Sequence, residues 1–214
     1  SESVWRIGQN KKITIIPLAN KHCQFIYLDK KKETFNEYGQ LIKVEYNNGQ
    51  TYDLSYENNV LNRVVDRFGQ VLKFNYNSQG LISSITLPNS RQITYQYDTL
   101  NRLSSVTRPS YGTKTYHYSE NSTVAPSGNP NLLTGITDET GKRYSNYSYD
   151  AQDRGVLTEH AGNAQRFKLI YTSGSTKVIG PYGTEVSYSH SPVSGIPKVN
   201  MVVRGYALQQ FNTY

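Results

Sequence analysis

The sequence predicts an all-β protein built from tandem β-hairpins, and three successive blocks within residues 57–118 carry this prediction. Each block ends with an aromatic residue, one intervening residue and a tyrosine. The closing tyrosines are Tyr76, Tyr97 and Tyr118, and consecutive members are 21 residues apart. A fixed spacing of this length is typical of architectures in which one supersecondary unit recurs along the chain.

Each block also contains two turns and two short strand-like stretches. A small turn-forming residue comes first and is followed by two apolar residues three positions apart. The turn formers are Asn59, Gly80 and Asn101, and the apolar pairs are Leu61/Val64, Ile82/Ile85 and Leu103/Val106. A second turn, rich in Asp, Asn, Pro and Gly, separates the pair from the closing aromatic strand. Two strands and two turns per period make one β-hairpin.

Composition favours a thin sheet over a thick core. Only 36% of the 214 residues are hydrophobic, yet 19 are tyrosine, and the mean hydropathy is −0.64. Such a chain suits a sheet that buries one face. The formal charge of +7 permits contact with nucleic acid, anionic membranes or acidic glycans. Because the basic residues are scattered, and the one run at 30–32 is typical of a solvated turn, we expect no nucleic-acid partner.

The chain divides into three predicted parts. Residues 1–24 are expected to be lead-in or capping strands, since they have strand composition without the full repeat signature. Residues 25–190 are the repeat array, and Asn47-Asn48-Gly49 predicts a type I′ hairpin turn within its first unit, which Tyr56 closes. Residues 191–214 are a tail or the start of a further repeat, with one more strand expected near 199–203. No helix is expected, and the ends of the sequence suggest a piece of a longer protein.

Later units of the array depart from the 21-residue period. The fifth is about ten residues too long, and the extra length falls in a loop-forming stretch at 121–130. The repeat pattern resumes at Asn131 and Leu133, and the unit ends at Tyr149. The sixth unit ends at Tyr171 and has Gly155 where an apolar residue is expected, so its pairing is the least certain.

The recurring tyrosines favour a structural role. Side chains two apart on a strand share a face, as Tyr95 and Tyr97 do, or Tyr116 and Tyr118. Stacked hairpins would then align aromatic rings in columns across neighbouring strands. The alternative is that the rings are stacking platforms for sugars or bases. A ring that recurs in every unit is more often part of the repeat's own packing.

The residues suggest no enzymatic chemistry. Cys23 has no second cysteine to pair with, and the four histidines show no metal-binding or catalytic spacing. We expect no catalytic residues, no cofactor and no metal site. No stretch approaches 18 consecutive apolar residues, so no membrane span is expected.

The sequence around the third block resembles the YD repeat of the bacterial Rhs family, which also occurs in the C components of insecticidal toxin complexes and in animal teneurins. Tyr97-Asp98, Arg102 and Leu103 match the repeat, and Tyr149-Asp150 repeats its first two residues. Several other units replace the aspartate. The positions that define the predicted repeat are Tyr56, Tyr76, Tyr95, Tyr97, Asp98, Arg102, Leu103, Tyr116, Tyr118, Tyr149, Asp150 and Tyr171.

The resemblance implies a curved, spiralling antiparallel sheet that forms part of a hollow β-shell. In Rhs-type polymorphic toxins this shell encloses a C-terminal toxic domain, so the expected partners are further repeats and the toxin domain of the same polypeptide. It also implies an exported bacterial protein, secreted or on the cell surface. At roughly 4.8 Å per strand, about 14 strands are too few to enclose a toxin, so we expect an open wall segment whose exposed edges could also self-associate. The alternative is a cell-surface adhesion module that binds glycans through tyrosines and basic residues.

Overall fold

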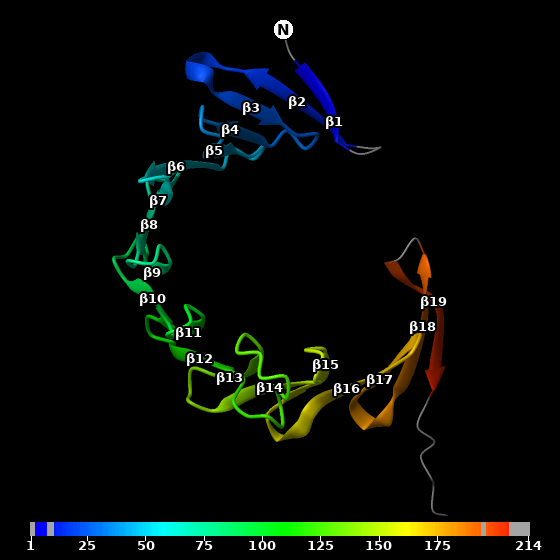
Figure 1. Ribbon diagram of the computed structural model, residues 1–214. Helices are drawn as coiled ribbons and strands as arrows, with labels where there is room; N and C mark the ends of the chain where they lie inside the picture. Colours follow the sequence, from blue (N-terminus) through cyan, green and yellow to red (C-terminus); the bar gives the residue numbers. More distant parts are fainter. Residues whose placement is uncertain (1–2, 8–10, 194–195, 206–214) are drawn as a thin grey trace, which may run out of the picture. The chain divides into compact units, whose positions relative to one another are not determined.

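The computed structural model describes residues 3–7, 11–193 and 196–205 of the chain. These residues contain nineteen β-strands, and their only helical segments are three short 3-10 turns (Figure 1). The turns are η1 (Ala19–Lys21), η2 (Ala161–Asn163) and η3 (Pro181–Gly183). The all-β class and the antiparallel hairpin array predicted from the repeats are confirmed.

The chain divides into two compact units, Ser1–Tyr95 and Gln96–Tyr214. In the first unit each strand pairs antiparallel with the next strand along the chain. Its strands are β1 (Ser3–Ile7), β2 (Lys11–Pro17), β3 (Cys23–Ile26), β4 (Lys32–Phe35), β5 (Leu41–Glu45), β6 (Thr51–Glu57), β7 (Val60–Asp66), β8 (Val71–Tyr76), β9 (Ile82–Thr86) and β10 (Gln92–Tyr97). The boundary between the units falls within β10.

The second unit follows the same plan, with consecutive antiparallel pairing from β11 to β19. Its strands are β11 (Leu103–Arg108), β12 (Gly112–Tyr118), β13 (Leu133–Thr137), β14 (Arg143–Tyr149), β15 (Gly155–His160), β16 (Ala164–Thr172), β17 (Ser175–Ile179), β18 (Glu185–Val193) and β19 (Ile196–Gly205). The long loop between β12 and β13 is the insertion predicted at 121–130, and β19 contains the strand expected at 199–203.

The ends of the array pair as its middle does. The expected lead-in holds β1, β2 and the start of β3, and β2 pairs with β3 just as β3 pairs with β4. At the other end, β18 extends past residue 190 and pairs with β19. The last part of the predicted tail, 206–214, lies outside the described residues.

One kind of turn recurs along the array, and Asp66 shows how the sequence specifies it. The N–H of Asp66 donates to the carbonyl of Gln70, and Gly69 N–H donates back to the carbonyl of Asp66, both at 3.0 Å. The Asp66 carboxylate accepts the N–H groups of Phe68 and Gln70 at 2.8 and 2.9 Å. Gly69 has a φ of +78°, which glycine adopts at no steric cost. The same side-chain bonds form at Asn36, Asn77, Asp98, Asp138 and Asp150.

The turn at 47–49 corrects the type I′ prediction. A type I′ turn needs a positive φ at both central residues, but of the three residues only Gly49 has one, at +79°. The Tyr46 N–H donates to Gln50 at 2.8 Å, so this loop has the three-residue form of the Asp66 turn. Two positive values occur instead at Asn58 (+50°) and Asn59 (+64°), where β6 turns into β7. Asn48-Gly49 is compatible with both a two-residue type I′ turn and a three-residue loop, so the flanking residues decide the loop length.

A β-bulge marks the junction between successive hairpins and explains the apolar pairs three residues apart. Between β6 and β7 the register shifts, so that Leu54 faces Val64 while Tyr56 faces Leu61. Leu54 and Tyr56 share a face, and the extra residue Asn62 puts Leu61 and Val64 on that face as well. Equivalent shifts precede Tyr76, Tyr118 and Tyr149. In a regular strand, residues three apart would lie on opposite faces.

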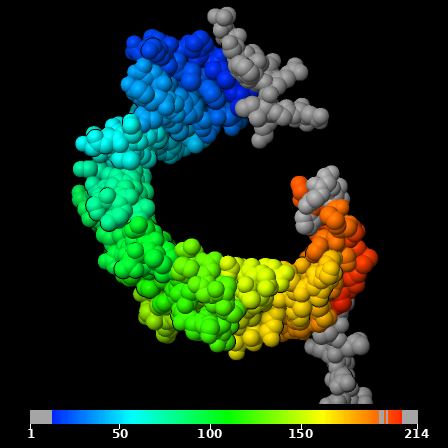
Figure 2. Space-filling model, in the orientation of Figure 1, coloured from blue at the N-terminus to red at the C-terminus, as the bar shows by residue number. Residues whose placement is uncertain are grey.

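The sheet of each unit is a single layer of strands, and in the space-filling view each unit is a thin band (Figure 2). Among the described residues, the buried hydrophobic side chains are Ile13, Val44 and Ala125, and most strand residues are half-buried. The array therefore depends mainly on backbone pairing and on contacts made from each hairpin to the next.

Candidate functional site

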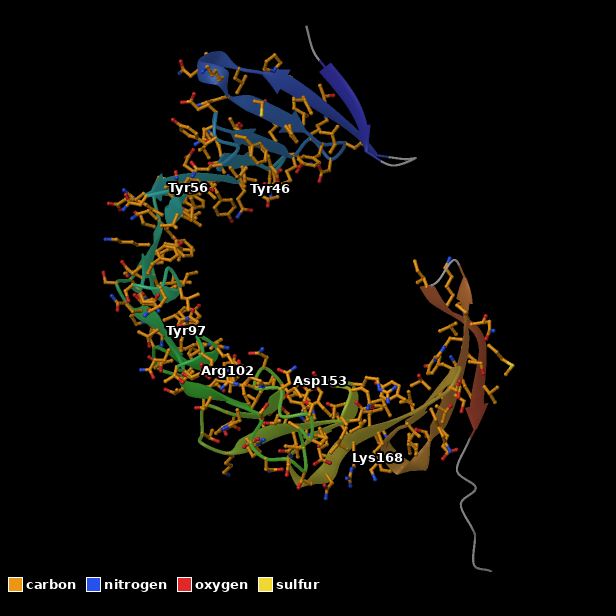
Figure 3. All side chains as sticks on the ribbon, in the orientation of Figure 1. Tyr46, Tyr56, Tyr97, Arg102, Asp153 and Lys168 are labelled. Carbon is orange, nitrogen blue, oxygen red and sulfur yellow. The ribbon has the colours of Figure 1, made fainter. Side chains whose placement is uncertain are left out.

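The recurring tyrosines close the open ends of the hairpins. In the β5–β6 hairpin the backbone ladder runs from the turn as far as Lys43 opposite Asp53 and then stops. Beyond that point the hydroxyl of Tyr56 on β6 donates to the carbonyl of Leu41 at the start of β5, at 3.0 Å. This bond, from the last tyrosine of a hairpin to a carbonyl at the start of its first strand, is termed the tyrosine clasp. Tyr56 is labelled in Figure 3.

The clasp recurs with nearly constant geometry in both units. The sequence separation between donor and acceptor is 15 or 16 residues, and the distances lie between 2.7 and 3.0 Å. The other pairs are Tyr76 with Leu61, Tyr118 with Leu103, Tyr149 with Leu133, and Tyr171 with Gly155. A carbonyl that loses its ladder partner needs another donor, and the tyrosine supplies one without extending the strands.

An aspartate and an arginine support the clasp where the repeat is most complete. Asp98 accepts bonds from Arg102 Nε and Nη2, both at 2.6 Å. The Arg102 guanidinium carbon then lies 4.5 Å from the ring centre of Tyr118, whose hydroxyl binds the adjacent Leu103 carbonyl. Aspartate, arginine and tyrosine therefore act as one group that links the turn before a hairpin to that hairpin's last strand. Arg102 is labelled in Figure 3.

The sixth unit repeats this group residue for residue. Asp150 binds Arg154 Nε and Nη2 at 2.7 Å, and the Arg154 guanidinium lies 4.5 Å from the ring centre of Tyr171. The Tyr171 hydroxyl donates to Gly155, so the glycine that made this unit's pairing uncertain takes part through its backbone alone. Because the clasp uses a carbonyl, the side chain at this position is free to vary.

Electrostatics at these groups agrees with a structural role. Hydrogen bonding to Arg154 lowers the pKa of the Asp150 carboxyl, so this aspartate stays ionised and bound. Burial raises the pKa of the Tyr56, Tyr118 and Tyr149 hydroxyls, which keeps them protonated as donors. Neither kind of shift brings a pKa closer to neutral pH, the range that suits a general acid or base.

The expectation that rings align with rings across strands is wrong at the clasp positions. Tyr56 faces Leu61, Tyr76 faces Ile82, and Tyr118 faces Leu133 in the next hairpin. Tyr116 likewise faces Ile136. At Tyr56, Tyr76 and Tyr118 the bulge brings an aliphatic residue of the following strand opposite the tyrosine.

Tyr95 and Tyr97 lie in β10, next to the unit boundary, and both are half-buried. The family's tyrosine–aspartate pair is thus split between the last residue of a strand and the first residue of the turn that follows. The tyrosine serves the hairpin before it, and the aspartate serves the hairpin after it.

The insertion builds the most enclosed part of the described chain, which the sequence did not predict. Glu120 binds Arg143 through two bonds of 2.9 and 2.6 Å and accepts a third from Thr134 at 2.8 Å. Thr134 is only 1% exposed and Ala125, in the insertion, only 3%. The guanidinium of Arg143 fits because it lies over Gly135, where a Cβ would be 1.7 Å from Arg143 Nη2. Arg143 and Gly135 carry no sequence pattern that marks them.

The outer part of the insertion is tied to the turn after β14. Asn129 Nδ2 donates to Asp153 at 2.8 Å, and the Ser127 hydroxyl also donates to that carboxylate. The Tyr149 N–H donates to the Val124 carbonyl at 2.8 Å. The loop predicted from composition is confirmed, and it is held at both ends by specific bonds. Asp153 is labelled in Figure 3.

The histidines of β12 and β15 contact residues on neighbouring strands. The ring of His117 bonds to Thr137, and the ring of His160 lies against that of Tyr144. Within the described part of the chain, no group of three or more His, Cys, Asp or Glu side chains could hold a metal ion. A search of the same residues finds no helix long and apolar enough to cross a membrane. A groove of about 920 Å³ lies beside β16, and Phe167, Ile179 and Tyr182 are among the residues that line it.

Comparison with known proteins identifies the repeat. The model of the RHS Repeat family matches residues 76–113, a segment that begins at one clasp tyrosine and includes Asp98 and Arg102. The resemblance to the YD-repeat (Rhs) family is confirmed over this segment. No curated protein matches the chain.

Several solved structures are similar to the chain at low identity. A crystal structure of TcdB2-TccC3-TEV is 12% identical, with 95% of this chain covered and a TM-score of 0.43. A Photorhabdus luminescens Tc holotoxin pore is 14% identical, with 92% covered and a TM-score of 0.38. TcdB2-TccC3 without its hypervariable C-terminal region is 15% identical, with 92% covered and a TM-score of 0.37. The alignments cover 16%, 15% and 16% of those chains, so this chain spans about one sixth of their length.

Proposed function

We propose that this array is a non-enzymatic wall segment of an exported Rhs-type toxin, part of the β-shell that encapsulates a C-terminal toxic domain. The observation that supports this most is the tyrosine clasp. The residues that define the repeat are engaged in closing their own hairpins, at 2.7–3.0 Å in five of them. When the defining side chains of a repeat bind backbone groups of the same hairpin, their main role is structural, as the wall of a shell requires.

The partners follow from this role. The array would contact further repeats and the toxic domain of its own polypeptide, and the whole protein would be exported from a bacterium. The Rhs repeat at 76–113 supports this assignment at the level of the family. The single-layer sheet also supports it, because one face of each hairpin remains available to enclosed cargo or to solvent.

An adhesion module that binds glycans through its tyrosines is the alternative, and the clasp argues against it. Five of the tyrosines already donate their hydroxyls to backbone carbonyls within the chain. A sugar stacked on one of these rings would compete with an arginine or with an aliphatic neighbour.

Protease protection in the parent polypeptide tests the proposal. We expect the downstream domain to resist digestion while the array is intact, and to become sensitive when Tyr76, Tyr118 and Tyr149 are all changed to alanine. A parent with no downstream domain, or one whose downstream domain is digested equally in both forms, would refute encapsulation. Glycan binding that one or two such changes abolish, with stability unaltered, would instead favour adhesion.

A further inference from the structure

One hairpin places two positive charges directly opposite each other. On β7 and β8, Arg63 faces Lys73 in the third ladder pair from the turn, on the face opposite the clasp tyrosines. Both side chains are exposed. Like charges directly opposite on a sheet destabilise the pairing. Some benefit other than hairpin stability is therefore needed to account for this pair.

Other hairpins of the array show which residues usually occupy the equivalent ladder position. It holds a lysine opposite an aspartate in one hairpin and hydroxyl pairs in two others. These pairs are Lys43/Asp53, Ser84/Thr94 and Ser105/Thr115. Among the hairpins that the structure describes, β7–β8 is the one with two cations at this position. The repeat thus provides an internal reference against which Arg63 and Lys73 stand out.

The two cations are uncompensated within the described chain. Neither Arg63 nor Lys73 forms an ion pair or a side-chain hydrogen bond with another described residue. The carboxylates on the same face of β6 are engaged elsewhere. Asp53 pairs with Lys43 at 4.0 Å, and Glu57 accepts a bond from Asn62 at 2.7 Å.

The surroundings of the pair are neutral hydrogen-bonding groups. Ser55 lies beside Arg63 on β6, and Thr86 lies beside Lys73 on β9, so one row across four strands reads hydroxyl, guanidinium, ammonium, hydroxyl. In the next row Asn75 donates to Ser84 at 3.0 Å. Directly opposed side chains start about 5 Å apart, a spacing that one carboxylate or sulfate group can bridge.

We propose that Arg63 and Lys73 bind the anionic group of an acidic glycan, either the carboxylate of a uronic-type sugar or a sulfate ester. The two cations hold the oxyanion, and the neighbouring hydroxyl and amide groups of Ser55, Asn75 and Thr86 bind sugar hydroxyls. This site goes beyond the role of the array as a wall, and it uses the polar face that the tyrosines leave free.

A nucleic acid fits this face less well. Its phosphates form a continuous charged chain, which would meet the carboxylates of Asp53 and Glu57 on either side of Ser55. Base stacking needs aromatic rings, and Tyr52, Tyr56 and Phe74 lie on the opposite face of these strands. An isolated oxyanion on an otherwise neutral, hydroxyl-rich polymer avoids both problems.

The test replaces the pair with the hydroxyl residues found in the other hairpins, as the double variant R63S/K73T. Binding is measured for sparsely sulfated dextran, largely methyl-esterified polygalacturonate, uncharged dextran and single-stranded DNA at matched ionic strength. We expect at least a tenfold loss of affinity for whichever of the first two polymers binds more tightly. We also expect an unfolding midpoint equal to or above that of the parent, because the repulsion is removed. The two acidic polymers distinguish a sulfate from a carboxylate ligand.

A matched control removes the same charge from the second unit, as K168T/K198S, and should bind as the parent does. Lys168 is labelled in Figure 3. An equal loss of binding in this control would show that binding depends only on net charge, and the proposed site would then be wrong. Unchanged binding in R63S/K73T, a lowered unfolding midpoint in that variant, or tighter binding to DNA than to either acidic polymer would overturn it as well.

Discussion

The hairpins of β5–β9 and the strands β13–β15 are built from the same repeat, but they are stabilised in different ways. In β5–β9 almost every strand residue is half-buried or exposed. The pairing there depends on the backbone ladder, the turns and the clasps of Tyr56 and Tyr76. At β13–β15 the insertion adds a local core in which Ala125, Thr134 and Ser145 are 3% exposed or less.

The difference shows which features belong to the repeat and which belong to one place in it. Turn chemistry, bulges and clasps occur in both regions, so they define the hairpin. The Glu120–Arg143 pair and the glycine that makes room for it occur at the insertion, so they are a local addition. Substitutions should therefore act through backbone conformation in β5–β9 and through packing in β13–β15.

Gly135→Ala should have the largest effect, because it acts on the packed region. The added Cβ would lie 1.7 Å from Arg143 Nη2 and would displace the guanidinium from Glu120 and Thr134. Leaving these polar groups unpaired should cost about 2 kcal/mol in the free energy of unfolding. Gly155→Ala is the matched control, because no atom lies within 4 Å of its Cβ position and its φ is not positive. Equal effects in chemical denaturation would show that the two regions do not differ.

Gly80→Ala should destabilise the open region by about 1 kcal/mol, through the backbone alone. Gly80 has a φ of +77° and no atom within 4 Å of its Cβ position, so the cost is conformational. Asn101→Gly, at the corresponding turn position with a φ of +60°, should be neutral or slightly stabilising. Thermal unfolding of the two variants measures this contrast, and a neutral Gly80→Ala would contradict the turn assignment.

Arg102→Gln should cost about 1 kcal/mol, since it removes both the ion pair with Asp98 and the cation–π contact with Tyr118. Glutamine already occupies this turn position at Gln40, where it bonds to Asn36 at 2.8 Å. Lys142→Gln is the control, because Lys142 follows Asp138 as Arg102 follows Asp98, yet its side chain is exposed. Equal destabilisation by the two changes, measured by urea denaturation, would mean that the stacked guanidinium contributes nothing.

Acid should weaken the β13–β15 region, where two carboxylates bind arginines. Hydrogen bonding to Arg143 lowers the pKa of Glu120, and bonding to Arg154 lowers that of Asp150. A lowered carboxyl pKa gives stability that is complete above the unfolded value of about 4 and is lost as the pH falls below it. Unfolding midpoints measured from pH 6 to pH 3 should therefore fall less steeply in Glu120→Gln than in the parent. If the midpoints of the parent and of Glu120→Gln fall in parallel with pH, Glu120 does not contribute to the acid sensitivity.

The sequence predicted the hairpins because their signals are local. Closing tyrosines, turn formers at Asn59, Gly80 and Asn101, and a loop at 121–130 can each be recognised within a few residues. The structure places these three residues in turns, with positive φ values of +64°, +77° and +60°. The spacing of three between Leu61 and Val64 was visible too, but a bulge was needed to give it structural meaning.

The sequence could not predict contacts that join distant residues. The clasp acceptors are backbone carbonyls, which leave no trace in side-chain identity, as Gly155 shows. The Glu120–Arg143 pair joins residues 23 positions apart across an insertion that no period constrains. The proposed anion site was equally hidden, since Arg63 and Lys73 stand out only once the register places them opposite each other.

The most direct test of the central claim is a series of single Tyr→Phe variants at Tyr56, Tyr76, Tyr118, Tyr149 and Tyr171. Phenylalanine keeps the ring and removes only the clasp hydroxyl, so each variant should lose about 1 kcal/mol of unfolding free energy. Tyr182→Phe, at a turn residue that is 99% exposed, should lose nothing. Similar losses at all five positions are the predicted result. Losses confined to one or two of them, or a loss no greater than that of Tyr182→Phe, would contradict the claim that the repeat exists to close its own hairpins.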